Sequence, residues 1–78
     1  MLLQLEEEKV IVLFANFFGV SPFKIDVSQD IIMQFGADTV DIKELSWIIS
    51  EEFNMPITET DVLSINCVIA ALNRSYND

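Results

Sequence analysis

The chain has 78 residues with a hydrophobic content of 51%, which excludes an intrinsically disordered protein and predicts one small domain over residues 1–78. Thirteen acidic residues against four basic ones give a net charge of −9, which disfavours nucleic acids and anionic membrane surfaces as partners. Charged partners are expected to present basic patches instead.

The amino-acid inventory also excludes several kinds of active site. The chain has no histidine and one cysteine, Cys67, so it can form no internal disulfide, Cys-His pair, Ser-His-Asp triad or zinc ligand set. The longest apolar run, residues 10–15, is far shorter than the roughly 20 residues of a membrane-spanning helix. Residues 1–15 lack the features of a secretion signal. We therefore expect a monomeric, cytoplasmic, non-enzymatic protein without membrane insertion.

The first predicted element is a helix over residues 3–18. Acidic residues at positions 6–8 lie in its early turns, and Gly19 provides a stop signal. At about 100° per residue, one broad apolar arc forms and leaves Val12 and Asn16 outside it. The arc contains Val10, Leu13, Phe14, Phe17 and Phe18. Because residues 10–12 are all β-branched, a strand over residues 10–13 is the alternative.

A long loop follows, which Ser21-Pro22 opens and which continues to about Asp30. Loops of this length in a small domain are often functional. We expect a structural role instead, with Phe23 or Ile25 as a buried anchor. Before the chain turns at residue 36, further apolar contacts are expected from Ile31, Ile32 and Phe35.

The second long helix, over residues 39–53, has the clearest start signal in the sequence. Asp38 is a suitable N-cap, and Asp41 at the third helical position adds a carboxylate near the positive end of the helix dipole. Asn54 ends the helix, and Pro56 disfavours a helical conformation at the preceding residue. The predicted core stripe consists of Ile42, Leu45, Ile49 and Phe53.

The opposite side of this helix mixes apolar with acidic residues. It carries Val40, Glu44, Trp47 and Glu51. A solvated face would be polar throughout, and tryptophan is a favoured anchor of protein interfaces. The pattern predicts a docking surface with an exposed Trp47. The alternative is that Trp47 folds back against residues 20–35.

The last elements are a short helical segment over residues 59–63, capped by Thr58, and a helix over residues 66–75. The core residues of the last helix repeat at spacings of three and four. They are Ile65, Val68, Ala71 and Leu72. No basic residue adjoins Cys67 in sequence, so we expect a small core residue rather than a reactive thiol.

The middle of the chain reads FGADTVDIKEL over residues 35–45. This stretch resembles the signature of acyl carrier proteins, in which a leucine-Gly-Ala-Asp-Ser-Leu-Asp run is followed by a Glu-Leu pair. Gly19-Val20 upstream, and residues 51–53 with Ile57 downstream, also match the family, so the resemblance covers about residues 7–73. It implies an all-α fold of the acyl-carrier type, a small four-helix bundle with three main helices, one short helix and a long first loop.

The resemblance also implies an attachment point. The family carries its substrates on a 4′-phosphopantetheine arm esterified to the signature serine, and Thr39 stands at that position. Threonine offers a hydroxyl, but its methyl group makes it a more crowded nucleophile with restricted χ1. Independently of the family, Thr39 is expected at the exposed first position of a helix, whose N-terminus favours the negative charge of a phosphodiester.

Partners and an acyl pocket follow from the same resemblance. Family members present acidic residues of their second helix to basic patches on synthase enzymes and on a phosphopantetheinyl transferase. The acidic residues at the corresponding places here are Asp38, Asp41, Glu44, Glu51 and Glu52. Val40 and Trp47 are the apolar residues expected in the same docking surface, whereas Lys43 departs from an often apolar position. The residues expected to line an acyl pocket are Leu45, Ile49, Ile57, Val62, Ile65 and Ala71, and each is also an ordinary core candidate.

Three hypotheses for function remain open at this point. The first is a carrier protein that holds acyl thioesters for fatty-acid or polyketide-type synthesis. The second is a degenerate carrier fold that stays unmodified at Thr39 and acts as a binding or scaffold subunit. The third is an unrelated acidic helical adaptor or inhibitor.

Overall fold

The regular structure of residues 4–77, which the computed structural model describes, is entirely helical. In chain order the elements are α1 (Gln4–Phe18), η1 (Pro22–Lys24), α2 (Ile31–Phe35), α3 (Thr39–Phe53), η2 (Thr60–Val62) and α4 (Ile65–Asn77), where η marks a 3-10 helix. The all-α prediction is therefore confirmed, and the alternative of a strand over residues 10–13 is wrong. None of these described helices is long and apolar enough to cross a membrane.

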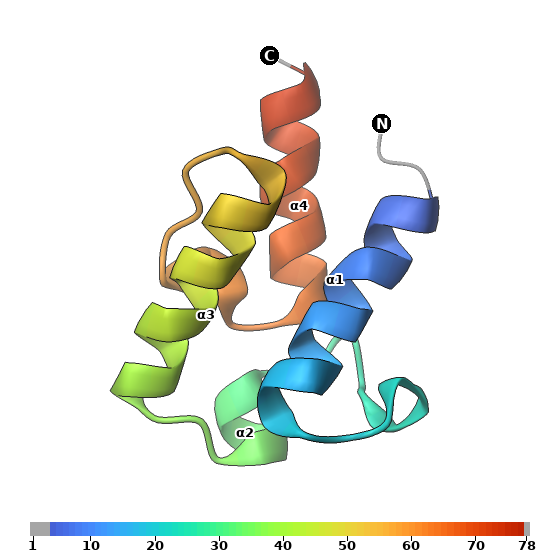
Figure 1. Ribbon diagram of the computed structural model, residues 1–78, viewed down its shortest axis with the longest axis vertical. Helices are drawn as coiled ribbons and strands as arrows, with labels where there is room; N and C mark the ends of the chain where they lie inside the picture. The colour runs from blue at the N-terminus through green and yellow to red at the C-terminus, as the bar shows by residue number, and fades with distance from the viewer. Residues whose placement is uncertain (1–3, 78) are drawn as a thin grey trace.

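Three long helices, α1, α3 and α4, enclose the core, and the short α2 lies at one end of them (Figure 1). Helix α1 contacts both α3 and α4, while η2 packs against α3 and α4. The first turn of α1 and the last turn of α4 both lie toward the end of the molecule opposite α2, and the start of α3 lies at the α2 end (Figure 1).

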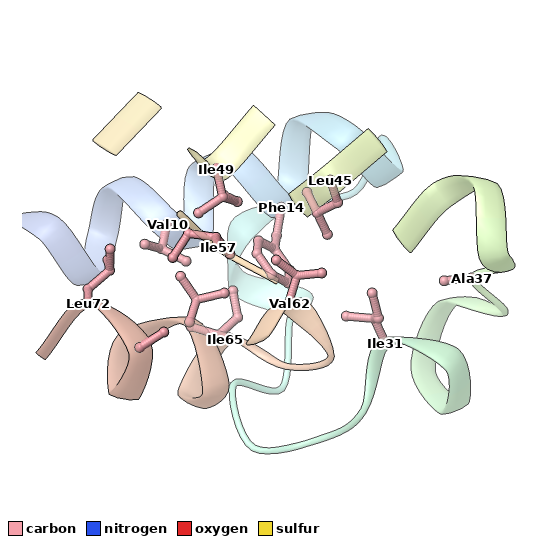
Figure 2. Close-up of a cluster of buried hydrophobic side chains, with 12 residues drawn as sticks. Val10, Phe14, Ile31, Ala37, Leu45, Ile49, Ile57, Val62, Ile65 and Leu72 are labelled. Carbon is pink, nitrogen blue, oxygen red and sulfur yellow. The ribbon is translucent and has the colours of Figure 1, made fainter. Parts of the chain in front are cut away.

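The core is one continuous cluster of buried side chains from α1, α2, α3, η2, α4 and the connecting segments (Figure 2). It comprises Val10, Phe14, Ile31, Ala37, Leu45, Ile49, Ile57, Val62, Ile65, Val68, Ala71 and Leu72. Burial of each large apolar side chain contributes about 1.5–3 kcal/mol, whereas isolated helices of this length are marginal in water. Packing, rather than helix propensity, therefore holds the helices in place.

Helix α1 buries the face that the sequence predicts. Val10 and Phe14 are fully buried, while Val12 and Asn16 are exposed. The helix ends before Gly19, whose φ of 67° is in the left-handed region that favours glycine. The Val20 N–H then donates to the Ala15 carbonyl at 3.0 Å. The predicted start at residue 3 lies outside the described residues.

Helix α2 was not predicted, because its five residues are too few to show a helical period. Its start is fixed by Asp30, whose carboxylate accepts a hydrogen bond from the Ile32 N–H at 2.7 Å. Its end is fixed by Gly36, which adopts a left-handed conformation. The rings of Phe18 and Phe35 stack with centroids 4.5 Å apart, which ties the end of α1 to the end of α2.

Of the two residues expected as alternative anchors of the loop before α2, Ile25 packs against the core and Phe23 does not. Ile25 is half-buried and packs against the core, as expected. Phe23 is 99% exposed, because it lies on η1, which buries no residue. Ile32 is also largely exposed, since Ile31 and Phe35 occupy the inward face of α2.

The loop is ordered by polar side chains within it. The Asp26 carboxylate accepts hydrogen bonds from the Ser28 hydroxyl at 2.7 Å and the Ser28 N–H at 3.0 Å. These bonds favour the charged form, and they lower the pKa of the Asp26 carboxyl. Between these two residues, the Val27 carbonyl accepts a hydrogen bond from the Asn66 N–H at 3.0 Å. The loop is thereby fastened to the first turn of α4.

The predicted short helical segment over residues 59–63 is present as η2. The N-cap of η2 is Glu59, which makes no side-chain cap hydrogen bond, so the prediction of Thr58 as the N-cap is wrong by one residue. The Thr58 hydroxyl accepts a hydrogen bond from the Asp61 N–H at 3.3 Å. The Asp61 carboxylate in turn accepts one from the Thr58 N–H at 3.0 Å. This exchange satisfies two amides at the start of the turn.

Helix α4 begins one residue before the predicted range and extends two residues past it. Its first turn is capped by the buried hydroxyl of Ser64, which accepts from the Cys67 N–H at 3.1 Å. The predicted core face is confirmed, since Val68 and Leu72 are fully buried. The core prediction for Cys67 is wrong, because a residue one position before Val68 lies about 100° around the helix and is exposed.

Candidate attachment and docking site

Thr39 occupies the first position of α3, and it is exposed as predicted. Asp38 and Asp41 form a reciprocal cap around it. The Asp41 N–H donates to Asp38 Oδ1 at 2.9 Å, and the Asp38 N–H donates to Asp41 Oδ2 at 3.1 Å. The backbone on both sides of Thr39 is therefore fixed, while its hydroxyl is accessible to an incoming reagent.

The chemistry open to Thr39 is esterification of its hydroxyl oxygen. A phosphodiester at this place would lie at the positive end of a 15-residue helix. The carboxylates of Asp38 and Asp41 partly oppose that effect, because they add negative charge on either side of Thr39. The arrangement thus presents an accessible nucleophile in an acidic setting, which suits a partner that brings its own positive charge.

The predicted docking surface is accessible along α3. Trp47 is 66% exposed and Val40 is 61% exposed, so the alternative in which Trp47 folds back against residues 20–35 is wrong. Glu44 and Glu51 are exposed on the same helix, and Asp41 is half-buried in the cap. Two apolar side chains thus lie on a helix that carries exposed carboxylates.

Glu52 differs from the other acidic residues of this helix. Its carboxylate lies 3.0 Å from the Lys9 ammonium group of α1. The same ammonium group lies 5.5 Å from the centroid of the Phe53 ring. Glu52 therefore connects α3 to α1, and its charge is partly neutralised within the chain.

The residues expected to line an acyl pocket are brought together in the core (Figure 2). Leu45, Ile49, Ile57, Val62, Ile65 and Ala71 are all buried members of the single cluster. The loop position of Ile57 is fixed by Ser50, whose hydroxyl donates to the Ile57 carbonyl at 3.3 Å and accepts from the Ile57 N–H at 3.1 Å. The plain prediction of core packing is confirmed for all six residues.

Met33 is an exposed apolar residue that the sequence analysis missed. It is 75% exposed on α2, six residues before Thr39. Two features of the sequence could have identified this short helix: Asp30 as its N-cap and Gly36 as its stop. On that helix, burial of Ile31 and Phe35 at a spacing of four leaves Met33 on the outer face.

A comparison of the chain with models of known protein families gives no match.

Proposed function

We propose that the protein is a non-catalytic acyl carrier whose attachment residue is Thr39. The observation that carries the proposal is the exposed hydroxyl of Thr39 at the first position of α3, inside a stretch that resembles the carrier signature. In the attachment step, the Thr39 oxygen bonds to the phosphorus of the donor and loses its proton. A phosphorus–oxygen bond to the donor's leaving group breaks, the leaving group takes up the Thr39 proton, and a phosphodiester remains on the protein.

The attached 4′-phosphopantetheine would supply a thiol on a flexible arm, which holds acyl groups as thioesters. The chain's own residues would position that arm and present it to enzymes. The cap formed by Asp38 and Asp41 fixes the attachment point, and exposed Val40 and Trp47 provide apolar contacts on the same helix. Partners would be cytoplasmic enzymes of acyl synthesis and a phosphopantetheinyl transferase, each with a basic patch.

An acyl chain would be sheltered by the core side of α3. Leu45 and Ile49 are buried there, and Ile57, Val62, Ile65 and Ala71 belong to the same cluster. Entry of an acyl chain requires these side chains to separate, since the same residues pack together in the protein described here. An acylated form should therefore be more stable than the unacylated form, because the acyl group replaces the lost side-chain contacts and buries its own apolar surface.

A second candidate function is an unmodified carrier fold that serves as a binding subunit. The observation that favours it is the β-branched side chain at residue 39, where the carrier signature has a serine. In that case the exposed face of α3 would be the functional surface, and the Thr39 hydroxyl would have no chemical role.

Co-expression with a phosphopantetheinyl transferase, followed by intact-mass measurement, tests the proposal. The wild-type chain should gain the mass of one arm, and the Thr39→Val variant should gain none. Valine is the matched control because it keeps the shape of threonine and removes the hydroxyl. If neither wild type nor Thr39→Ser is modified by several transferases, the binding-subunit function replaces the carrier function.

A further inference from the structure

A second surface feature lies between α1 and η1, and it shares no residue with the exposed face of α3. It is an open hollow of about 330 Å³. Its lining residues are Glu8, Ile11, Val12, Pro22 and Phe23. In Figure 1, α1 and the loop that follows it lie on one side of the bundle, and α3 lies on the other. The hollow is therefore available when α3 is engaged.

The walls of the hollow are apolar and open to solvent. Val12 is 45% exposed on α1, and Phe23 is 99% exposed, so its ring stands at the rim rather than against the wall. The position of the ring is set by the backbone of η1. The Ser21 hydroxyl accepts from the Phe23 N–H at 3.4 Å, and the Ser21 carbonyl accepts from the Lys24 N–H at 3.0 Å. A partner that covers this surface would remove the ring and the valine from water, which is favourable.

Glu8 gives the hollow its charge. It is the one charged residue among the lining residues, and its carboxylate makes no hydrogen bond or ion pair within the described part of the chain. Lys24 follows Phe23, but it is exposed and does not line the hollow. The complement of this surface is an apolar side chain accompanied by a cation.

We propose that this hollow docks a segment of a partner protein that carries one large apolar side chain and a lysine or arginine about one helical turn away. The spacing follows from α1, because Glu8 and Val12 are four residues apart and thus about 6 Å apart along the helix axis. A second copy of this chain is a poor occupant, since each copy carries a net charge of −9.

Selection of displayed random peptides on the full chain tests the proposal. Peptides of about twelve residues form about three helical turns. We expect the enriched sequences to share a large apolar residue and a lysine or arginine three or four positions apart. Their binding should fall at least about tenfold in Phe23→Ala, because Phe23 is the largest apolar side chain among the lining residues and is exposed until a partner covers it. Phe23→Ala should fold normally, since the side chain is 99% exposed.

Matched variants separate this hollow from other surfaces. Glu8→Gln should weaken binding about two- to fivefold and reduce its salt dependence, while Glu7→Gln, also exposed on α1, should leave binding unchanged. Met33→Ala, Trp47→Ala and Thr39→Val should also bind normally, so failure of the carrier function leaves this test intact.

Three results would overturn the proposal. The first is that no peptide is enriched, or that enriched peptides lack a cation. The second is that their binding is unaffected by Phe23→Ala. The third is a wild-type dimer in sedimentation equilibrium that Phe23→Ala dissociates, which would make a second copy the occupant.

Discussion

The side-chain amide of Gln34 pairs with the main chain of Asp26 in both directions. Gln34 Oε1 accepts from the Asp26 N–H at 3.0 Å, and Gln34 Nε2 donates to the Asp26 carbonyl at 2.9 Å. The same Nε2 also donates to the Gln29 carbonyl at 2.9 Å. One side chain of α2 thus supplies three hydrogen bonds to main-chain groups of the loop.

Replacement of Gln34 by alanine should loosen this loop. The variant loses three hydrogen bonds to backbone groups, and their exposed setting limits the cost to about 1–2 kcal/mol of unfolding free energy. Urea denaturation measures the change. Gln29→Ala is the matched control, because its exposed side chain makes none of these bonds. Equal stabilities for the two variants would show that the Gln34 contacts do not hold the loop.

Trp47 and Ile49 lie two residues apart on α3, and their substitutions should have opposite consequences. Trp47→Ala should change stability little, because the side chain is 66% exposed. It should weaken complexes with the proposed partner enzymes. Ile49→Ala should cost about 2–5 kcal/mol, because the side chain is fully buried. Acrylamide should quench Trp47 fluorescence readily in the wild type. A blue-shifted, protected emission with severe destabilisation in Trp47→Ala would place the ring in the core.

Asp61 should contribute stability that disappears in acid. The pKa of the Asp61 carboxyl is lowered below its ordinary value of 3.8, chiefly by the hydrogen bond from the Thr58 N–H. Desolvation by burial opposes this shift, while the Thr58 hydroxyl and the Arg74 guanidinium at 3.2 Å add to it. A carboxyl with a lowered pKa in the folded state binds its proton more tightly in the unfolded chain. The contribution of Asp61 to stability is therefore complete at pH values above the pKa that its carboxyl has in the unfolded chain. It is lost as the pH falls through the pKa of the same carboxyl in the folded protein.

Urea titrations of wild type and Asp61→Asn across the acidic range measure this contribution. The stability difference between the two should be largest near neutral pH and should shrink below about pH 4. Glu59→Gln is the control, since Glu59 is exposed and its side chain caps nothing. A difference between wild type and Asp61→Asn that stays constant with pH would contradict the hydrogen-bonding account.

Added salt should raise the thermal midpoint. Thirteen acidic residues against four basic ones make repulsion the dominant electrostatic contribution, and screening weakens it. The ion pairs of Lys9 with Glu52 and Arg74 with Asp61 involve partly exposed groups, so their loss costs little. Differential scanning calorimetry at increasing sodium chloride provides the measurement. A midpoint that falls between low and moderate salt would mean that attractive pairs dominate.

Long helices and their buried faces could be predicted from the sequence, because periodicity and end signals agree there. Helix α3 begins at Thr39 and ends at Phe53, as Asp38 and Asn54 indicate. Shorter elements could not be predicted in this way. Helix α2 has no room for a second turn of periodic residues, and its position depends on the Ile31 N–H donating to the Leu63 carbonyl at 2.8 Å. That contact joins residues far apart in the chain.

The candidate site likewise contains features that could be predicted from the sequence and features that could not. The exposure of Trp47 followed from its helical angle relative to the core stripe, and that of Thr39 followed from its place at the first position of the helix. The exposure of Phe23 did not, because an aromatic residue in a loop is ordinarily a buried anchor and no pattern around it indicates otherwise. Cys67 was placed in the core from its chemistry, although its position on α4 relative to Val68 places it in solvent.

The proposed carrier function depends on transfer of an arm to a crowded hydroxyl. Crowding by the threonine methyl should cost a few kcal/mol in a transferase site shaped for serine. Each 1.4 kcal/mol is about tenfold in rate, so modification should be slower by about two to three decades. Thr39→Ser removes the methyl at an exposed position and should leave the fold and stability almost unchanged.

The most direct test is a timed transferase assay, read by intact mass, that compares wild type with Thr39→Ser. The account predicts conversion of both proteins to the arm-bearing form, with the serine variant about 100- to 1,000-fold faster. Equal rates would show that the methyl group does not hinder transfer, although Thr39 would remain the attachment residue. Absence of the arm on both proteins would contradict the carrier function.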